Sequence, residues 1–259
     1  MELCVFNRYR LRASGILAAT LFLTALAVGE EPEVGHETET GREPERSMFV
    51  LTSTNDATNN HVVVFKLDTA PTPSLSLVDT LSTGGKGGAQ ANAGILQFKD
   101  NLGAVANYGS NSVTQLLRHD DWISVGETID LAHGCAKPVS VALNREQLLV
   151  VGATCVESHS WPSGALDGTV VRLADPSAAQ VAIGKTWASV TLTSGSVLQL
   201  ELTHDGALSG TSAPIRLPNT ANDTPLGAAF WGNILGYTPA HSSDSFVVVN
   251  QERGVAAVC

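Results

Sequence analysis

The sequence lacks several patterns that would indicate a function directly. It contains no Gly-x-Ser-x-Gly nucleophile elbow, no Cys-x-x-Cys pair and no Gly-Lys-[Ser/Thr] phosphate loop. Its seven histidines do not have the spacing of a metal-binding set, so we assign no metal and no cofactor. The net charge of −10 and the absence of a basic stripe argue against nucleic acid and anionic membrane surfaces as partners.

Long helices are also absent from the pattern. After residue 30, no segment repeats apolar residues at i, i+3, i+4 and i+7 over several turns. Short β-branched runs instead alternate with clusters of Gly, Asn, Asp, Ser and Thr, which is typical of an all-β domain. The predicted strands are 48–52, 61–67, 75–81, 95–98, 102–107, 112–117, 122–128, 139–143, 147–151, 169–173, 180–183, 187–192, 196–202, 226–231 and 245–250.

The first 47 residues differ from the rest. Three arginines within the first 12 residues precede an apolar run at 16–28, and small residues at positions 27 and 29 provide a cleavage site. The run is shorter than the about 20 residues of a membrane-spanning helix. We therefore expect a signal peptide at 1–29, a disordered acidic linker at 30–47 and a secreted product without membrane insertion, with an uncleaved anchor as the alternative.

Similar strands recur along the chain at a regular interval. Val113 and Val197 occupy equivalent places 84 positions apart, which is twice the about 42 residues of a four-stranded propeller blade. Further versions contain Val62 and Val170. Only 27 positions separate Val170 from Val197, so either a strand is missing there or the register jumps to the neighbouring blade. The domain 48–259 then holds about five blades, as an open or truncated β-propeller whose exposed edge can self-associate.

Four positions bear on the covalent features of a secreted chain. Cys135 and Cys155 flank a predicted strand pair, and a disulfide between them is the leading interpretation because their spacing matches no zinc motif. Cys259 would be left without a partner in the chain, which calls for another chain or a continuation. Asn222 begins an Asn-Asp-Thr glycosylation sequon.

Several segments, most of them predicted strands and turns, resemble those of a known family. They are 49–52 (Phe-Val-Leu-Thr), 62–65 (Val-Val-Val-Phe), the glycine-rich 83–88, 94–96, 104–113, 137–141 and 224–230. Together they resemble the lactonase-like seven-bladed β-propellers of the 6-phosphogluconolactonase and carboxymuconate-cyclase type. The resemblance covers about the first two thirds of such a protein and implies an incomplete member of the family.

The resemblance implies a hydrolase that acts on a sugar lactone. One alternative is a non-catalytic propeller that binds a carbohydrate or a protein partner, and another is a truncated chain that does not fold alone. Lactone opening requires an activated water or nucleophile and stabilisation of an oxyanion. The catalytic candidates are the group nearest the cysteine pair, His133, Arg145, Glu157 and His159, and the alternative is that they are polar loop residues around a structural bridge.

Two loops and three aromatic residues complete the predictions. The segment 155–167 is longer than a hairpin needs, so Trp161 is either an exposed anchor for a ligand or a plug for its blade. No helical pattern follows the glycine-rich segment 83–94, which predicts a flexible connection between blades rather than a phosphate cradle. Trp187, Phe230 and Trp231 are expected to pack between blades.

Overall fold

The computed structural model describes residues 48–69, 71–89, 93–210, 215–217, 224–240, 246–250 and 255–258. They belong to one compact unit, Arg46–Cys259. The predicted signal peptide and linker, the sequon at Asn222 and the unpaired Cys259 all lie outside the described residues. No helix within the described ranges has the length and apolar character that crossing a membrane requires.

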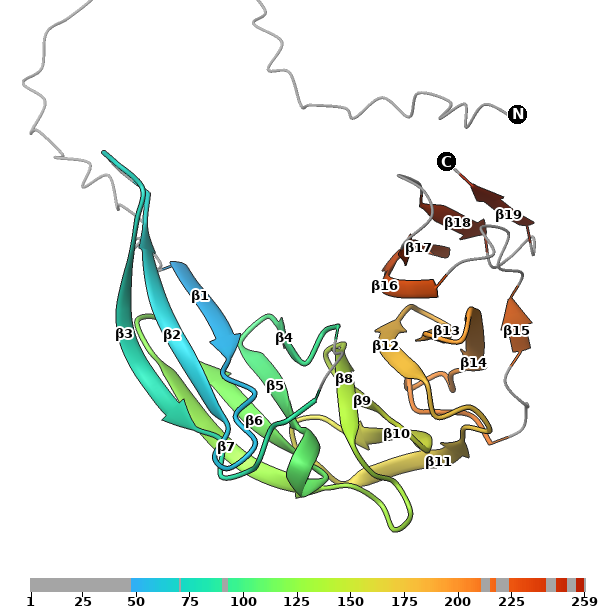
Figure 1. Cartoon of the computed structure of the whole chain (residues 1–259), viewed down its shortest axis with the longest axis horizontal. Helices are drawn as coiled ribbons and strands as arrows, with labels where there is room; N and C mark the ends of the chain where they lie inside the picture. Colours follow the sequence, from blue (N-terminus) through green and yellow to red (C-terminus); the bar gives the residue numbers. More distant parts are fainter. Residues whose placement is uncertain are drawn as a thin grey trace, which may run out of the picture. The chain divides into compact units, whose positions relative to one another are not determined.

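The described residues form five antiparallel sheets, and each sheet is a meander of strands that follow one another in the chain (Figure 1). We call these sheets blades 1 to 5. Blade 1 comprises β1 (Met48–Ser53), β2 (His61–Asp68) and β3 (Ser74–Ser82). Blade 2 comprises β4 (Leu96–Lys99), β5 (Leu102–Asn107), β6 (Ser112–Arg118) and β7 (Ile123–Asp130).

The next three blades each have four strands. Blade 3 comprises β8 (Pro138–Leu143), β9 (Gln147–Gly152), β10 (Cys155–Ser160) and β11 (Leu166–Arg172). Blade 4 comprises β12 (Ala178–Ile183), β13 (Trp187–Leu192), β14 (Ser196–Glu201) and β15 (Ile215–Leu217). Blade 5 comprises β16 (Thr224–Trp231), β17 (Ile234–Ala240), β18 (Val247–Asn250) and β19 (Val255–Val258). The prediction of an all-β, propeller-like fold with about five blades is confirmed.

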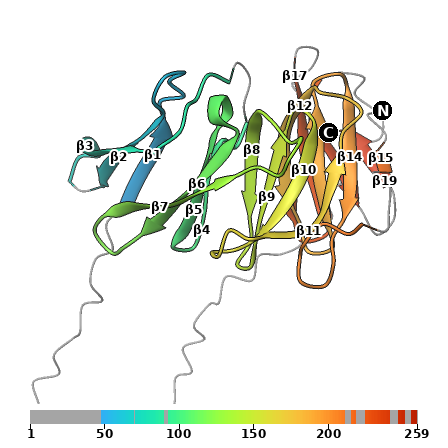
Figure 2. The ribbon, with the colours of Figure 1, turned by 90° about the horizontal axis from the view of Figure 1, so that it is seen from below.

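Apolar side chains fill the space between successive blades. Because side chains of a strand alternate between its two faces, one strand can contribute to two interfaces. In β9, Leu148 and Val150 pack toward blade 2, whereas Leu149 and Val151 pack toward blade 4. Blade 3 is therefore buried on both faces, and Figure 2 shows its strands between those of blades 2 and 4.

The same kind of cluster occurs at each junction between blades. Val62 and Val64 of blade 1 meet Leu116 of blade 2, and Val197 of blade 4 meets Leu235 of blade 5. These residues have almost no exposed surface. Burial of apolar surface at about 25 cal/mol per Å² therefore stabilises the contacts between blades as well as the blades themselves.

The predicted repeat is explained by one strand that the sequence pattern missed. Val62 on β2 of blade 1 is equivalent to Val113, Val156 and Val197 on the third strands of blades 2, 3 and 4. The intervals are 51, 43 and 41 residues, and all four valines are fully buried. Val170 instead lies on β11, the outermost strand of blade 3. The interval of 27 residues between Val170 and Val197 compares β11 with β14, which are not equivalent strands. The equivalent strand in blade 3 is β10, which the sequence pattern does not predict.

Polar bridges connect the first strands of neighbouring blades. On β8, the Ser140 hydroxyl donates to the Gly94 carbonyl (3.4 Å) and accepts from the Val181 N–H of blade 4 (3.2 Å). On β12, the Gln180 amide donates to the Ala228 carbonyl (3.1 Å) and accepts from the Ala228 N–H (2.8 Å). Each bridge satisfies backbone groups that the sheets leave free, so it adds a specific hydrogen bond to an otherwise apolar contact.

A buried asparagine network joins blades 1 and 2. The side-chain oxygen of Asn107, Oδ1, accepts hydrogen bonds from the side-chain amide of Asn60 (3.0 Å) and from the Thr83 hydroxyl (2.7 Å). The Asn107 amide donates to the Thr114 hydroxyl (2.8 Å). Gly85 packs directly on the Asn107 side chain, where a Cβ atom would overlap it. The glycine-rich segment is thus a connection between blades, as predicted, but its part 83–89 is tightly packed rather than flexible.

We expect Asn107→Ala to lower the free energy of unfolding by about 2–3 kcal/mol. The change leaves the polar groups of Asn60, Thr83 and Thr114 buried with fewer partners, and each unsatisfied buried group costs about 1–3 kcal/mol. Urea unfolding followed by circular dichroism measures the loss. Asn101→Ala removes the same side chain from an exposed turn and should change stability by less than about 0.5 kcal/mol. Equal effects of the two changes would contradict this role of the network.

Candidate functional site

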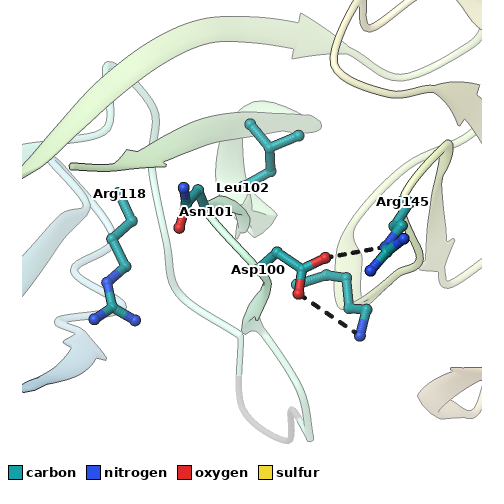
Figure 3. A pocket seen from close by; sticks show the side chains of 6 residues that line it. Asp100, Asn101, Leu102, Arg118 and Arg145 are labelled. Carbon is teal, nitrogen blue, oxygen red and sulfur yellow. Dashed lines mark hydrogen bonds and ion pairs between the residues drawn. The ribbon is translucent and has the colours of Figure 1, made fainter. Parts of the chain in front are cut away.

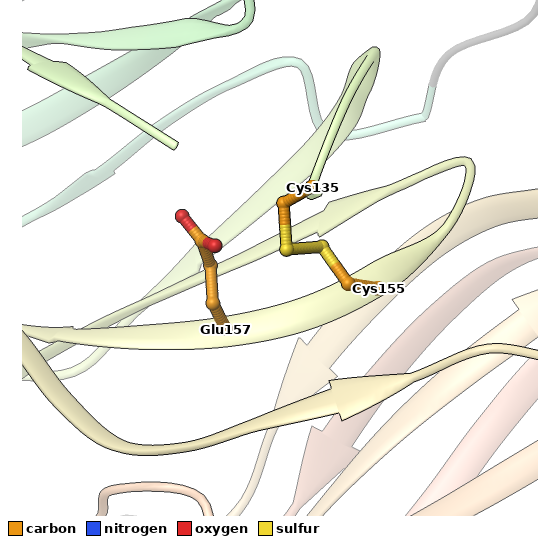
Figure 4. Close-up of side chains that lie close together, drawn as sticks. All are labelled: Cys135, Cys155 and Glu157. Carbon is orange, nitrogen blue, oxygen red and sulfur yellow. A yellow bond between two sulfur atoms is a disulfide. The ribbon is translucent and has the colours of Figure 1, made fainter. Parts of the chain in front are cut away.

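The predicted disulfide between Cys135 and Cys155 is confirmed. The two Cα atoms lie 5.5 Å apart, and both residues are buried. The bond joins the connection between β7 and β8 to the first residue of β10, beside Glu157 (Figure 4). The two sulfur atoms and a Glu157 oxygen lie within 4.8 Å of one another, but the sulfurs are bonded to each other, so this group is not a metal site. Closure of this 20-residue loop constrains the unfolded chain, worth about 3 kcal/mol.

Glu157 and His159 form a buried pair on β10. They are two positions apart and so lie on the same face of the strand. Glu157 Oε1 and His159 Nε2 are 2.8 Å apart, and the side chains are 0% and 2% exposed. The Glu157 carboxylate also accepts the Ala132 N–H at 3.1 Å, and His159 Nδ1 lies 3.0 Å from the Gly164 carbonyl. The pair therefore ties β10 to the loops on either side of it.

The partners of the ring determine where its protons lie. The Gly164 carbonyl only accepts hydrogen bonds, so His159 Nδ1 carries a proton and donates it. The other ring nitrogen, Nε2, contacts Glu157 Oε1 at 2.8 Å, so both ring nitrogens have a partner inside the protein. The geometry therefore favours the structural alternative for these two catalytic candidates.

The sequence pattern missed β10 because its side chains are polar. The strand reads Cys-Val-Glu-Ser-His-Ser, and a rule that seeks apolar alternation classes it as a loop. It is nevertheless buried, because Glu157 and His159 satisfy each other and Ser158 donates to the Asp167 carbonyl. The signal that could have revealed it is the blade interval, which places a third strand close to Val156.

Trp161 lies inside the protein. It is buried in the cluster between blades 2 and 3, and within the described ranges its indole N–H has no hydrogen-bond partner. Of the two alternatives for this residue, the structure shows the packing role, because a buried ring offers no surface to a ligand. Trp231, in contrast, lies at the surface. It was expected to pack between blades, but it is 76% exposed.

The other two catalytic candidates lie at opposite ends of β8. His133 is exposed in the loop before this strand, where its carbonyl accepts from the Arg172 guanidinium (2.8 Å). Arg145 lies in the turn after the strand, and its Nε donates to Asp100 Oδ2 at 3.3 Å. Six strand residues span about 20 Å. The structure thus brings Glu157 and His159 together but does not bring the four candidates into one site.

Arg145 lines a hollow of about 420 Å³ that we call the basic pocket, together with Lys99, Asp100, Asn101, Leu102 and Arg118. Its residues come from the β4–β5 turn, the β8–β9 turn and the end of β6. Figure 3 shows Asp100 directed toward Arg145, with Arg118 on the other side of the turn. The Arg118 N–H donates to the Asn101 carbonyl (2.8 Å), which fixes the end of β6 against this turn.

The charges of the basic pocket contrast with those of the whole chain. Three cations and one carboxylate line the pocket, and two of the cations pair with that carboxylate, whereas the whole chain carries a net charge of −10. Asp100 lies 4.0 Å from Lys99 Nζ and 3.3 Å from Arg145 Nε, and both ion pairs are solvent-exposed. Exposed pairs contribute about 0–1 kcal/mol, so Lys99 and Arg145 can exchange Asp100 for another anion at little cost. Guanidinium groups bind carboxylate and phosphate through paired N–H donors.

Three ionisable groups outside the basic pocket have shifted pKa values. A hydrogen bond from the Thr58 side chain, with further ones from the backbone, lowers the pKa of Asp56 to about 2. Hydrogen bonds from Gln147 (3.0 Å) and Ser160 (2.9 Å) hold the pKa of Asp167 below its usual value. Burial raises the pKa of Tyr237 to about 12. These shifts arise from turn and core contacts and do not indicate a catalytic group.

Comparison with solved structures identifies similar folds. A candidate 6-phosphogluconolactonase from Bacteroides uniformis superposes with a TM-score of 0.58 at 15% sequence identity, over 82% of this chain and 67% of that protein. A second from Bacteroides fragilis gives 0.57 at 16% identity, over 81% and 66%. The computationally designed protein Ika8 gives 0.51 at 13% identity, over 76% and 58%. The chain spans about two thirds of the length of the two Bacteroides proteins.

These similarities define the class of fold. The chain has a lactonase-like β-propeller fold, as the resemblance of its sequence implied. No protein-family model matches the sequence, and no curated protein matches it. At identities of 13–16%, the comparisons establish the fold alone.

We expect Glu157→Ala to destabilise the chain by about 3–5 kcal/mol, because it leaves His159 Nε2 and the Ala132 N–H buried without their partner. Glu157→Gln can still accept from Ala132 and donate to His159, so its cost should be below about 2 kcal/mol. Thermal and urea unfolding of both variants measures the difference. A folded Glu157→Gln chain that loses an activity of the wild type would contradict the purely structural role.

Proposed function

We propose that the chain is a secreted lactonase-like propeller that hydrolyses an anionic sugar lactone bound in the basic pocket. The observation that carries the proposal is that three cations and one carboxylate line a single hollow of about 420 Å³. The fold similarity to candidate 6-phosphogluconolactonases supports a lactone as the substrate class. An anionic substrate fits because this cationic group stands out on an acidic chain.

The residues of the basic pocket have the chemistry that lactone hydrolysis requires. Arg118 and Arg145 would hold the phosphate or carboxylate of the substrate through charge-assisted hydrogen bonds. Asp100 would accept a proton from a water molecule as its oxygen attacks the lactone carbonyl carbon, and Lys99 would stabilise the oxyanion. The acyl C–O bond then breaks. The proton held by Asp100 passes to the departing ring oxygen, which gives the open hydroxy acid.

Secretion is part of the proposal. The buried disulfide between Cys135 and Cys155 supports it, because such bonds persist in oxidising compartments and are rare in the cytosol. The apolar run at 16–28 and the small residues after it support it from the sequence. Mass spectrometry of the mature N-terminus tests it directly. A product that begins near residue 30 is the expected result, and an intact N-terminus would contradict it.

A second candidate function is the binding of a small anion without turnover. The exposure of the basic pocket favours this alternative, since the Arg145 side chain is 81% exposed. Electrostatic stabilisation of a transition state is strongest where water is excluded, whereas recognition of an anion by guanidinium groups also operates at an exposed surface.

We expect Arg145→Ala to raise the KM for 6-phosphogluconolactone about twofold to fivefold, because the Arg145 side chain is 81% exposed and an exposed ion pair contributes about 0–1 kcal/mol. The KM for unphosphorylated glucono-lactone should change little. Asp100→Asn should lower kcat by about a hundredfold or more, because the amide does not accept the proton from water. Acid release in a pH-stat, corrected for spontaneous hydrolysis, measures both parameters.

Lys185→Ala removes an exposed cation from another turn and serves as the matched control, with both parameters expected to be unchanged. Calorimetric titration with the non-hydrolysable product 6-phosphogluconate separates the two candidates. Saturable binding that Arg145→Ala weakens, with no turnover by the wild type, would support the binding alternative. If the wild type shows no binding and no turnover, both candidate functions are overturned.

A further inference from the structure

Blade 1 has one apolar face that the described residues leave exposed. Its other face contributes Phe49, Leu51, Val62 and Val64 to the cluster with blade 2. On the exposed face, the strand register aligns two rows of side chains across β1, β2 and β3. These rows, Met48–Leu67–Leu75 and Val50–Phe65–Leu77, form what we call the blade-1 end face.

The large apolar side chains of the blade-1 end face are unusually exposed. Leu77 is 61% exposed, Leu75 56% and Met48 51%. Large apolar side chains grouped on one sheet face mark an interaction surface, whereas isolated ones do not. The strands of this blade are therefore patterned to be covered on both sides, as those of blade 3 are.

Blade 5 carries a corresponding surface at the other end of the series. Its Leu235, Tyr237, Val247 and Val249 pack toward blade 4. The alternate residues of the same strands form the opposite face, which we call the blade-5 end face, Ala229, Trp231, Ile234, Gly236, Thr238, Phe246 and Val248. The exposed Trp231 belongs to this face, which gives a reason why it does not pack inside the chain.

The blade-5 end face carries small residues where β16 and β17 pair. Ala229 and Gly236 are cross-strand neighbours. A Cβ atom built on Gly236 would meet nothing closer than the Ala229 carbonyl at 4.0 Å. An adjoining hollow of about 480 Å³ is lined by these two residues and Phe246, and also by Gln180 of blade 4 and by Ala228 and Tyr237, which face blade 4. The blade-1 end face, in contrast, presents long side chains such as Met48, Leu75 and Leu77.

The two end faces are complementary because of the repeat itself. Each blade has one face toward the blade before it in the chain, its preceding side, and one face toward the blade after it, its following side. Within the chain, the following side of each blade packs on the preceding side of the next blade. The blade-5 end face is a following side, and the blade-1 end face is a preceding side. We propose that the blade-5 end face of one copy packs on the blade-1 end face of a second copy. This contact continues the established series of contacts between blades and is heterologous, so it joins copies head to tail.

Sedimentation velocity of the full chain over a wide concentration range tests the proposal. The wild type should form complexes whose size grows with concentration. Leu77→Glu blocks one end face and Trp231→Glu blocks the other, and each variant alone should sediment as a monomer. Ser76→Glu puts the same charge on the opposite, exposed side of β3 and should behave as the wild type.

Mixing the two blocked variants gives the sharpest result. Each retains one intact end face of the opposite kind, so an equimolar mixture should form a dimer and nothing larger. Monomeric wild type at all concentrations would overturn the proposal, as would association that survives either substitution. A Trp231→Glu chain that still dimerises would mean that the blade-1 end face pairs with itself. If Leu77→Glu fails to fold by circular dichroism, Leu75→Lys tests the same face.

Discussion

Burial of each sheet against its neighbours is the constraint on which the rest of the structure depends. A single blade cannot bury its apolar faces alone, so neighbouring blades must stack to form a continuous core. Blade 3 meets the requirement on both faces, through Leu148 and Val150 on one side and Leu149 and Val151 on the other. Blades 1 and 5 meet it on one face only. Exposed apolar faces at the two ends follow from the same pattern that builds the interior.

Polar residues enter these interfaces where a specific partner offsets the cost of burial. Asn107 can be fully buried because its side-chain oxygen accepts and its side-chain nitrogen donates a hydrogen bond. Gly85, which has no side chain, leaves space for it. Ser140 and Gln180 serve the backbone of the adjacent blades in the same way. Glu157 and His159 are a further case, in which two titratable side chains satisfy each other. Chemically reactive residue types therefore occupy the core, while the charges of Lys99, Asp100 and Arg145 in the basic pocket are exposed.

Much of the fold could be predicted from the sequence, and less of the site. Strands 102–107 and 187–192 were predicted with the bounds that the structure shows, because clusters of turn-forming residues lie directly before and after each of them. β10 was missed because Glu157 and His159 lie in contact with each other, which sequence spacing alone does not show. Arg145 was recognised as a candidate, but Lys99 and Arg118 were not, since the hairpin turns that bring them together are distant in sequence. The disulfide was predicted because only two cysteines flank the central strands.

Native-state hydrogen exchange of the chain, at concentrations too dilute for association, tests most directly whether contacts between blades carry the stability. Amides of β9 lie in a blade that is buried on both faces and should exchange most slowly. Amides of β2 and β17 lie in blades covered on one face and should exchange faster, through partial opening at the two ends. Protection in β2 and β17 equal to that in β9 would contradict the account, because it would mean that stability does not follow the number of covered faces.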